Sequence, residues 1–153
     1  MQKKILVAVD GSKVSDNALE IAIDMAKPMG AKIAVIAVID ERVAEIVSKT
    51  CGDPISEITR DFEEANKGYL ERAKNIAAKK GMQIETRLVR GTPATQIAEE
   101  AEKSNPFLIV LGCHGLSGGI TSRDKKLIGS TAERVIRMCC GHGFSRSILL
   151  VTE

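Results

Sequence analysis

The sequence predicts an α/β protein with a doubly wound, mostly parallel five-stranded sheet in the order 3-2-1-4-5 and helices on both faces. Short, almost continuous aliphatic runs such as KILVAVD (4–10) and PFLIVLG (106–112) are typical of strands buried on both faces. Segments with apolar residues every three or four positions alternate with these runs and indicate helices. Right-handed crossovers between parallel strands then place the helices on both sides of one sheet.

The first strand is expected at 4–10 and leads directly into a helix. Ser12 or Ser15 can cap the start of this helix, and Pro28 together with Gly30 ends it. An inward stripe of aliphatic residues follows the helical period: Leu19, Ala22, Ile23 and Ala26.

A second buried strand is expected at 32–40. The segment 41–55 carries charged and turn residues without firm periodicity, so we expect an irregular or partly helical connection there. The longest helix is expected at 56–80, with Gly81 at its C-terminal stop. Its apolar positions recur at spacings of three and four: Ile58, Phe62, Ala65, Tyr69, Ala73 and Ile76.

The second half of the chain continues the alternation of strands and helices. The segment 82–90 alternates enough to predict a strand nearer the sheet edge, and Thr92 and Pro93 then supply a cap and a first helical residue. The remaining elements are a buried strand at 106–112, a short helix at 130–140 and a last strand at 146–153.

Composition limits the classes of partner and the number of domains. The 153 residues predict one domain (1–153), and a formal net charge of +2 with 27% charged residues gives no single-signed field for nucleic acid or a membrane surface. Only 3% of residues are aromatic, which removes the stacking platforms of single-strand nucleic-acid binders. No signal peptide or membrane-spanning run of about 20 apolar residues is recognisable. We therefore expect a cytoplasmic protein that binds neither nucleic acid nor membranes.

The cysteines and histidines invite a metal hypothesis, because thiolate and imidazole suit zinc. Adjacent cysteines on a helix cannot easily point at one ion, however, and no second C-x2-C motif is present. We expect no metal site and no disulfide framework, with Cys139 packed inward and Cys140 on a more exposed face. The residues concerned are Cys113, His114, Cys139, Cys140 and His142.

The glycine-rich segment after the fourth strand is the strongest functional feature. In a doubly wound sheet, Asp10 at the end of the first strand and this segment flank the switch point of strand order, where such sheets bind ligands. Gly129, Ser130 and Thr131 open the last helix with free N–H groups that suit a phosphate, and the glycines before them let the backbone close over a ligand. The alternatives are a flexible connection without ligand and, for Asp10, a helix-capping role.

Neither a P-loop nor a dinucleotide-binding glycine fingerprint occurs in the chain. Along nearly its whole length, the chain instead resembles the universal stress protein family. The shared motifs are ILVAVDGS with Asp10, VID at the end of the second strand, RGTP before the third helix, IVLGCHG at the end of the fourth strand, GSTAERVI opening the last helix, and the terminal ILLVTE.

The resemblance implies cytoplasmic homodimers with the expected fold, one branch of which binds ATP through G-x2-G-x9-G-[ST]. Here Gly112 and Gly115 supply the first part of that motif, and Gly129 with Ser130 supplies the last. The family pattern has nine residues between these parts, whereas this chain has thirteen, 116–128, so the loop carries four extra residues. Counting nine back from Gly129 reaches Gly119, which offers a shifted closure.

The resemblance also implies roles for individual residues. Asp10 lies beside the adenosine and bonds either the ribose or a metal-bound phosphate, while Val9 and Val38 line the adenine slot. The residues passing along the ribose and phosphates are Leu111, Gly112, His114 and Gly115, and those holding the phosphates are Gly129, Ser130 and Thr131. Arg123, Lys125 and Lys126 either reach a terminal phosphate or are solvated.

These observations predict an ATP-binding regulatory or stress-response homodimer, with Mg²⁺ accompanying the nucleotide and an unknown protein as partner. The aliphatic terminal strand is the expected place of two-fold pairing. No catalytic base or P-loop lysine is identifiable, so we expect slow hydrolysis at most and no dedicated enzyme. The alternative is a nucleotide-free dimer of the same type that acts as a protein-interaction module.

Overall fold

The computed structural model describes residues 2–115, 128–140 and 146–152. Its five strands form one sheet in the order β3-β2-β1-β4-β5, and every neighbouring pair is parallel, which confirms the expected fold class. The elements in chain order are β1 (Lys4–Ala8), α1 (Lys13–Met29), β2 (Lys32–Asp40), α2 (Glu41–Cys51), α3 (Ile55–Lys79), β3 (Glu85–Gly91), α4 (Pro93–Ser104), β4 (Leu108–Gly112), α5 (Ser130–Cys139) and β5 (Ser147–Val151).

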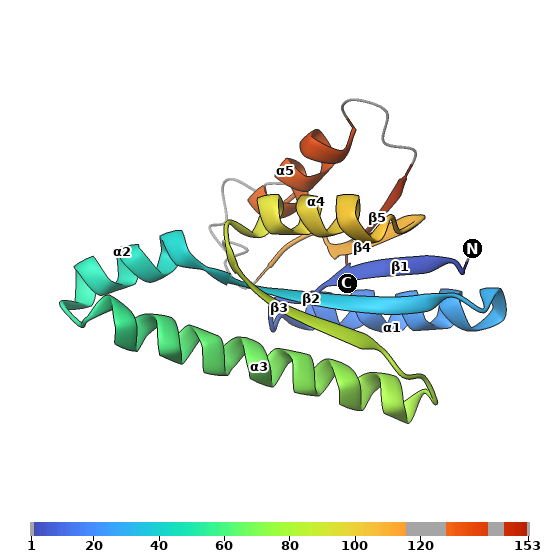
Figure 1. Cartoon of the computed structure of the whole chain (residues 1–153), viewed down its shortest axis with the longest axis horizontal. Helices are drawn as coiled ribbons and strands as arrows, with labels where there is room; N and C mark the ends of the chain where they lie inside the picture. Colours follow the sequence, from blue (N-terminus) through green and yellow to red (C-terminus); the bar gives the residue numbers. More distant parts are fainter. Residues whose placement is uncertain (1, 116–127, 141–145, 153) are drawn as a thin grey trace.

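Two helices cover each face of the sheet, and each face has its own aliphatic core (Figure 1). On one face, α1 and α3 pack against the strands through residues that include Leu19, Ile23 and Leu70. On the other face, α4 and α5 pack through residues that include Ile97 and Val135. The sheet is therefore buried on both sides, as its continuous aliphatic strands require.

Helix α1 begins and ends where its local chemistry predicts. The Ser12 side chain accepts a hydrogen bond from the Ser15 N–H at 3.1 Å, which makes Ser12 the N-cap. Gly30 is the C-cap in the left-handed conformation, with a φ of 60°, and Pro28 is tolerated in the last turn. The predicted inward stripe is fully buried.

Helix α3 agrees with its predicted limits within one residue at each end, but its inward face differs in part from the predicted stripe. Of the expected residues, Ile58 and Ala73 are buried and Ala65 is exposed, while the others are half-buried. Asn66, Leu70 and Ala77 are buried in addition. The helix is long and mostly solvated, so its apolar residues alone do not define the buried face.

The connection expected to be irregular or only partly helical at 41–55 is instead the regular helix α2, followed by a short turn before α3. Asp40 caps α2 by accepting hydrogen bonds from the N–H groups of Arg42 and Val43, and Gly52 ends it with a φ of 78°. Ala44 is the buried residue of this helix, so there was little core-facing periodicity to detect. The features of the sequence that indicate this helix are its two capping residues, Asp40 and Gly52.

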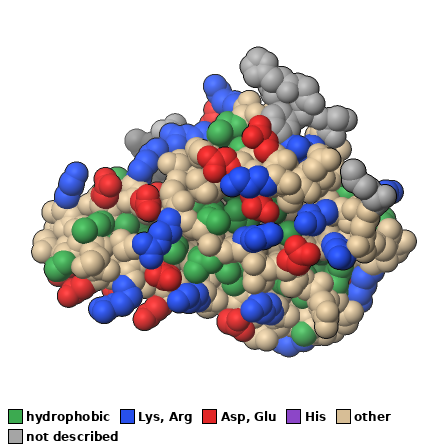
Figure 2. Space-filling view, in the orientation of Figure 1, with side chains coloured by type: hydrophobic (Ala, Val, Ile, Leu, Met, Phe, Trp, Pro, Cys, Tyr) green, Lys and Arg blue, Asp and Glu red, His purple; other side chains and the backbone are tan. Residues whose placement is uncertain are grey.

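The sheet edges are β3 and β5, which confirms the predicted edge position of the third strand. On the face drawn in Figure 2, basic and acidic side chains are interspersed, in agreement with the small net charge. Among the described residues, no helix combines the length and apolarity that crossing a membrane requires.

Candidate functional site

The turn after β1, the end of β4 and the start of α5 meet at the carboxyl edge of the sheet. The Gly129 N–H donates a hydrogen bond to the Cys113 carbonyl at 2.7 Å, so the chain returns to the end of β4 just before α5 begins. The Cys113 N–H in turn donates to the Val151 carbonyl at 2.7 Å, which ties this segment to β5. The structure therefore places both ends of the glycine-rich segment together.

The glycines at this edge are packed so closely that an added Cβ atom would force neighbouring atoms to move. A Cβ atom at Gly115 would collide with the Asp10 carboxylate oxygen Oδ2. A Cβ atom at Gly129 would lie 3.0 Å from the Cys113 carbonyl oxygen, and one at Gly112 would lie 3.0 Å from Val14 Cγ1. These three glycines allow main chain to approach main chain and the carboxylate directly.

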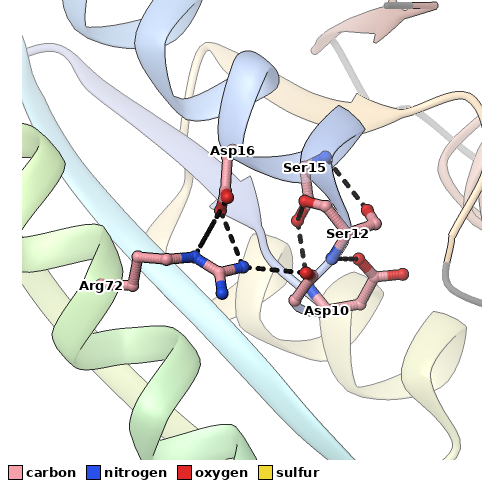
Figure 3. Close-up of polar contacts among 6 residues, drawn as sticks. Asp10, Ser12, Ser15, Asp16 and Arg72 are labelled. Carbon is pink, nitrogen blue, oxygen red and sulfur yellow. Dashed lines mark hydrogen bonds and ion pairs between the residues drawn. The ribbon is translucent and has the colours of Figure 1, made fainter.

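Asp10 lies in a tight turn between β1 and α1 (Figure 3). Its Oδ1 accepts a hydrogen bond from the Ser12 N–H at 3.0 Å, and its own N–H donates to Ser15 Oγ at 3.3 Å. Ser12, rather than Asp10, is the N-cap of α1. The capping role considered for Asp10 is therefore filled by Ser12, while Asp10 stabilises the turn and lies beside Gly115.

The start of α5 presents main-chain N–H groups for which the described residues supply no side-chain cap. Gly129 is the N-cap and makes no side-chain capping hydrogen bond, while Ser130 and Thr131 are exposed. The first N–H groups of a helix carry a partial positive charge and favour anions. This helix end therefore has the chemistry to bind a phosphate group.

A cavity of about 80 Å³ adjoins this helix end, between the starts of α2, α4 and α5. This volume is far below the roughly 300–1,000 Å³ of typical ligand pockets, so it suits part of a ligand, such as one phosphate group. Two cationic side chains, Arg42 and Arg134, lie on its wall, although neither was among the predicted site residues. The full lining is Asp40, Arg42, Thr92, Pro93, Ala94, Ser130, Thr131 and Arg134.

The structure does not bring every predicted residue together. The Val9 side chain packs in the core on the α1 and α3 face, whereas Val38 packs against the core on the α4 and α5 face. The two side chains therefore cannot line one slot jointly, because the sheet lies between them. The Leu111 side chain is buried in the core on the α4 and α5 face, so only the main chain of Leu111 can face the site.

The remaining predicted positions are of two kinds. His114 is half-buried at the end of β4, beside Gly115. The shifted closure at Gly119 and the cationic residues Arg123, Lys125 and Lys126 lie outside the described residues.

Cys139 is buried and Cys140 is exposed, as predicted. Burial raises the pKa of the Cys139 thiol. Within the described ranges, no cluster of three or more His, Cys, Asp or Glu residues is placed to hold a metal ion, and His142 lies outside those ranges.

The sequence reasoning also missed two residues of α3 that contact the turn carrying Asp10. The Tyr69 ring packs against Gly11, and Arg72 donates a hydrogen bond to the Gly11 carbonyl at 2.8 Å. No local pattern could reveal contacts across about 60 residues of sequence. The positive φ of Gly11, +85°, is consistent with the Asp-Gly-Ser turn signal.

Proteins of similar sequence cover most of this chain. Universal stress protein MJ0531 of Methanocaldococcus jannaschii is 36% identical over 137 residues, which cover 90% of this chain and 77% of that protein. Universal stress protein YxiE of Bacillus subtilis is 34% identical over 143 residues, which cover 90% of this chain and 94% of that protein.

Solved structures share the fold. The structure of the protein MJ0577 superposes with a TM-score of 0.76 at 26% identity and covers 100% of this chain and 97% of its own. A universal stress protein in complex with cAMP superposes with a TM-score of 0.59 at 26% identity and covers 99% of this chain and 97% of its own. The family model described as "Universal stress protein family" matches residues 1–139. From this match and from its relatives, the chain belongs to the universal stress protein family.

Proposed function

We propose that this protein binds ATP at the carboxyl edge of its sheet and acts as a nucleotide-dependent regulatory protein. The observation that carries the proposal is the packing of Gly112, Gly115 and Gly129, where Cβ atoms would meet Val14, the Asp10 carboxylate and the Cys113 carbonyl. A connection without ligand has no need of such close approach at both of its ends. The packing instead suits a main-chain cradle at the switch point of the sheet.

The phosphates are bound at the start of α5. The main chain of Gly129, Ser130 and Thr131 offers N–H groups, and the hydroxyls of Ser130 and Thr131 are exposed beside them. On the adjoining cavity wall, the two guanidinium groups of Arg42 and Arg134 outnumber the single Asp40 carboxylate, so the wall adds net positive charge at the same end. The phosphate chain therefore meets both main-chain donors and guanidinium groups.

The adenosine is bound between the ends of β1, β2 and β4. The adenine meets the half-buried apolar side chain of Val38 and the main chain at Val9. The ribose follows the main chain of Leu111, Gly112, His114 and Gly115. The similar protein in complex with cAMP shows that a member of this fold at 26% identity accepts an adenosine phosphate. This similarity supports an adenine nucleotide as the ligand.

The donor set fits Mg²⁺ brought in with the nucleotide. Mg²⁺ prefers oxygen ligands, keeps several waters and is commonly bound by one or two carboxylates together with phosphate oxygens. Asp10 Oδ2 lies beside Gly115, and the Ser130 and Thr131 hydroxyls lie at the phosphate end. These oxygens would hold the ion, which when bound would neutralise phosphate charge.

The protein acts as a cytoplasmic homodimer in which nucleotide occupancy sets the state recognised by another protein. In support of a dimer, β5 is an edge strand, and its residues Ile148, Leu149 and Leu150 are only partly buried. Such an edge favours pairing with a second copy. Size-exclusion chromatography with light scattering should give twice the chain mass; a monomer at micromolar concentration would contradict the dimer.

Titration calorimetry of Mg-ATP tests the nucleotide site, after mass spectrometry has established whether nucleotide co-purifies. We expect saturable binding by the wild type and its loss in a Gly129→Val, Ser130→Leu double variant that keeps its circular dichroism spectrum. The control is Gly68→Ala on the exposed side of α3, where nothing lies within 4 Å of an added Cβ. Absence of both binding and co-purified nucleotide would leave the nucleotide-free interaction module as the better function.

A further inference from the structure

Helix α3 contacts the turn that contains Asp10 through two residues one helical turn apart, Tyr69 and Arg72. Arg72 Nη2 donates a hydrogen bond to the Gly11 carbonyl at 2.8 Å, and Arg72 Nε lies 3.0 Å from Asp16 Oδ2 in the first turn of α1 (Figure 3). A single planar guanidinium therefore joins α3 to the turn and to the helix that follows it.

Tyr69 makes the second contact with the turn by packing its ring against Gly11. A Cβ atom at Gly11 would lie only 2.5 Å from Tyr69 Cζ, and the Arg72 guanidinium carbon lies 5.8 Å from the centre of the same ring. Gly11 also has a positive φ, so both its conformation and its contact with Tyr69 require glycine. The ring and the hydrogen bond hold the turn from the α3 side.

The turn held in this way fixes the Asp10 carboxylate. Asp10 Oδ1 accepts the Ser12 N–H at 3.0 Å within the same turn, and its Oδ2 lies beside Gly115. A displacement of Gly11 would move Asp10 relative to the glycine-rich segment, because Gly11 is its neighbour in the chain. The Arg72 contacts thus reach the candidate site through Gly11.

We propose that Arg72, supported by Tyr69, is a positioning residue for nucleotide binding that holds Asp10 in its binding geometry through Gly11 and Asp16. The inference rests on the proposed nucleotide site. Arg72 and Asp16 are partly exposed, with side-chain exposures of 44% and 24%, so their ion pair adds little to the free energy of unfolding. Its main effect is on the position of the turn, and hence on affinity.

The chain offers a matched control for this contact. Lys80, just after α3, also forms an ion pair with α1, through Asp24 at 2.8 Å, but Asp24 lies two helical turns further along α1 than Asp16. Lys80→Ala removes this surface ion pair and a longer one with Glu20 at 3.9 Å, without touching the turn after β1. A purely structural role predicts similar effects of Arg72→Ala and Lys80→Ala.

Calorimetry with Mg-ATP on wild-type protein, Arg72→Ala and Lys80→Ala tests the proposal, with thermal unfolding measured in parallel. We expect Arg72→Ala to raise the Kd about tenfold, as loss of a residue that orients a binding group does, and Lys80→Ala to change it by less than about twofold. Arg72→Lys keeps the charge but lacks the planar fork, so its Kd should lie between those of Arg72→Ala and wild type.

A double-mutant cycle with Asp10→Asn separates positioning from general weakening. If Arg72 acts through Asp10, Arg72→Ala changes the Kd by less than about twofold in the Asp10→Asn background. Additive losses, equal effects of Arg72→Ala and Lys80→Ala, or wild-type affinity in Arg72→Ala would overturn the proposal. If Arg72→Ala does not fold, unchanged affinity in Arg72→Lys overturns it instead. A wild-type protein that binds no nucleotide refutes the proposed function itself, which distinguishes the two failures.

Discussion

Two neighbouring strands of the sheet lead into helices through an aspartate, and the two aspartates are used differently. Asp40, the last residue of β2, is the N-cap of α2, and its Oδ1 accepts the N–H groups of Arg42 at 3.1 Å and Val43 at 3.2 Å. After β1, Ser12 caps α1, and Asp10 accepts the Ser12 N–H at 3.0 Å.

The difference follows from two residues in the chain. Gly11 and Ser12 stand between Asp10 and α1, whereas α2 begins directly after Asp40. Because the Ser12 hydroxyl supplies the cap, Asp10 stands outside the helix and its Oδ2 lies beside Gly115. An aspartate at a strand end caps the next helix when that helix begins directly after it, as α2 does after Asp40. Where another residue is the cap, as Ser12 is for α1, the aspartate side chain can face the candidate site instead.

The largest expected effect comes from breaking the contact between Asp10 and the glycine-rich segment. Gly115→Ala introduces a Cβ atom that collides with Asp10 Oδ2, so the carboxylate must move, and we expect Mg-ATP affinity to fall by more than about tenfold. Gly68→Ala, in open space within α3, should keep wild-type affinity and unfold at a higher temperature. Calorimetry measures both affinities, and equal Kd values for the two variants would refute the contact's role.

Substitutions of the two aspartates should affect different properties: Mg-ATP affinity for Asp10 and the free energy of unfolding for Asp40. Asp10→Asn removes a carboxylate charge from the site and should weaken Mg-ATP binding about tenfold, in line with loss of a charge-assisted interaction. Asp40→Ala removes a helix cap and should lower the free energy of unfolding by about 1 kcal/mol. Because Asp40 also lies on the wall of the cavity beside α5, loss of its negative charge should not weaken Mg-ATP binding. Urea unfolding and calorimetry on both variants check this; the reverse pattern would contradict the division of roles.

A smaller effect is expected from substitution of Ser12, the residue that caps α1 in place of Asp10. Ser12→Ala removes the hydroxyl that accepts the Ser15 N–H and should cost about 1 kcal/mol, or about 2–4 °C in Tm. The Ser12 N–H still bonds Asp10, so affinity should change by less than about threefold. Thermal unfolding monitored by circular dichroism tests this prediction. An unchanged Tm would show that the Ser12 cap does not stabilise α1.

The smallest effect concerns Glu63, a surface carboxylate that neither caps a helix nor contacts the candidate site. A hydrogen bond from Lys67, with help from Arg90, lowers the pKa of Glu63 below its ordinary value of 4.5. Its contribution to stability is therefore present above pH 4.5 and disappears as the pH falls through the lowered pKa. The urea midpoints of wild type and Glu63→Gln should differ slightly at pH 7 and converge in acid; a difference that grows in acid would be the wrong sign.

The sequence contains enough information to predict the sheet, because β1, β2, β4 and β5 are aliphatic runs and α1, α3 and α4 carry buried apolar stripes. Helix α2 was expected only as an irregular or partly helical connection, because Ala44 is its buried residue; its local signals are the caps Asp40 and Gly52. The adenine slot at Val9 and Val38 stays a prediction; the structure adds that the two side chains pack on opposite faces of the sheet, which the motif cannot show because it gives positions along the chain alone.

The candidate site was predictable where its residues follow strand ends in sequence, as Asp10 and Gly112 do. The contacts of Tyr69 and Arg72 with Gly11 were not, because they join residues about 60 positions apart. Such contacts depend on how α3 packs on α1, which the helical period alone does not determine. The cavity wall formed by Arg42 and Arg134 depends in the same way on three separate helix starts.

The central claim is that an adenine nucleotide binds at the carboxyl edge of the sheet, and amide chemical shifts measured during a Mg-ATP titration test it most directly. We expect saturating shifts at Asp10, from Gly112 to Gly115 and from Gly129 to Thr131, with a common Kd. The amides of Ala31 and Gly81, before β2 and β3 at the opposite edge, should not move. Saturating shifts confined to the opposite edge, or none at any of these residues, would contradict the account.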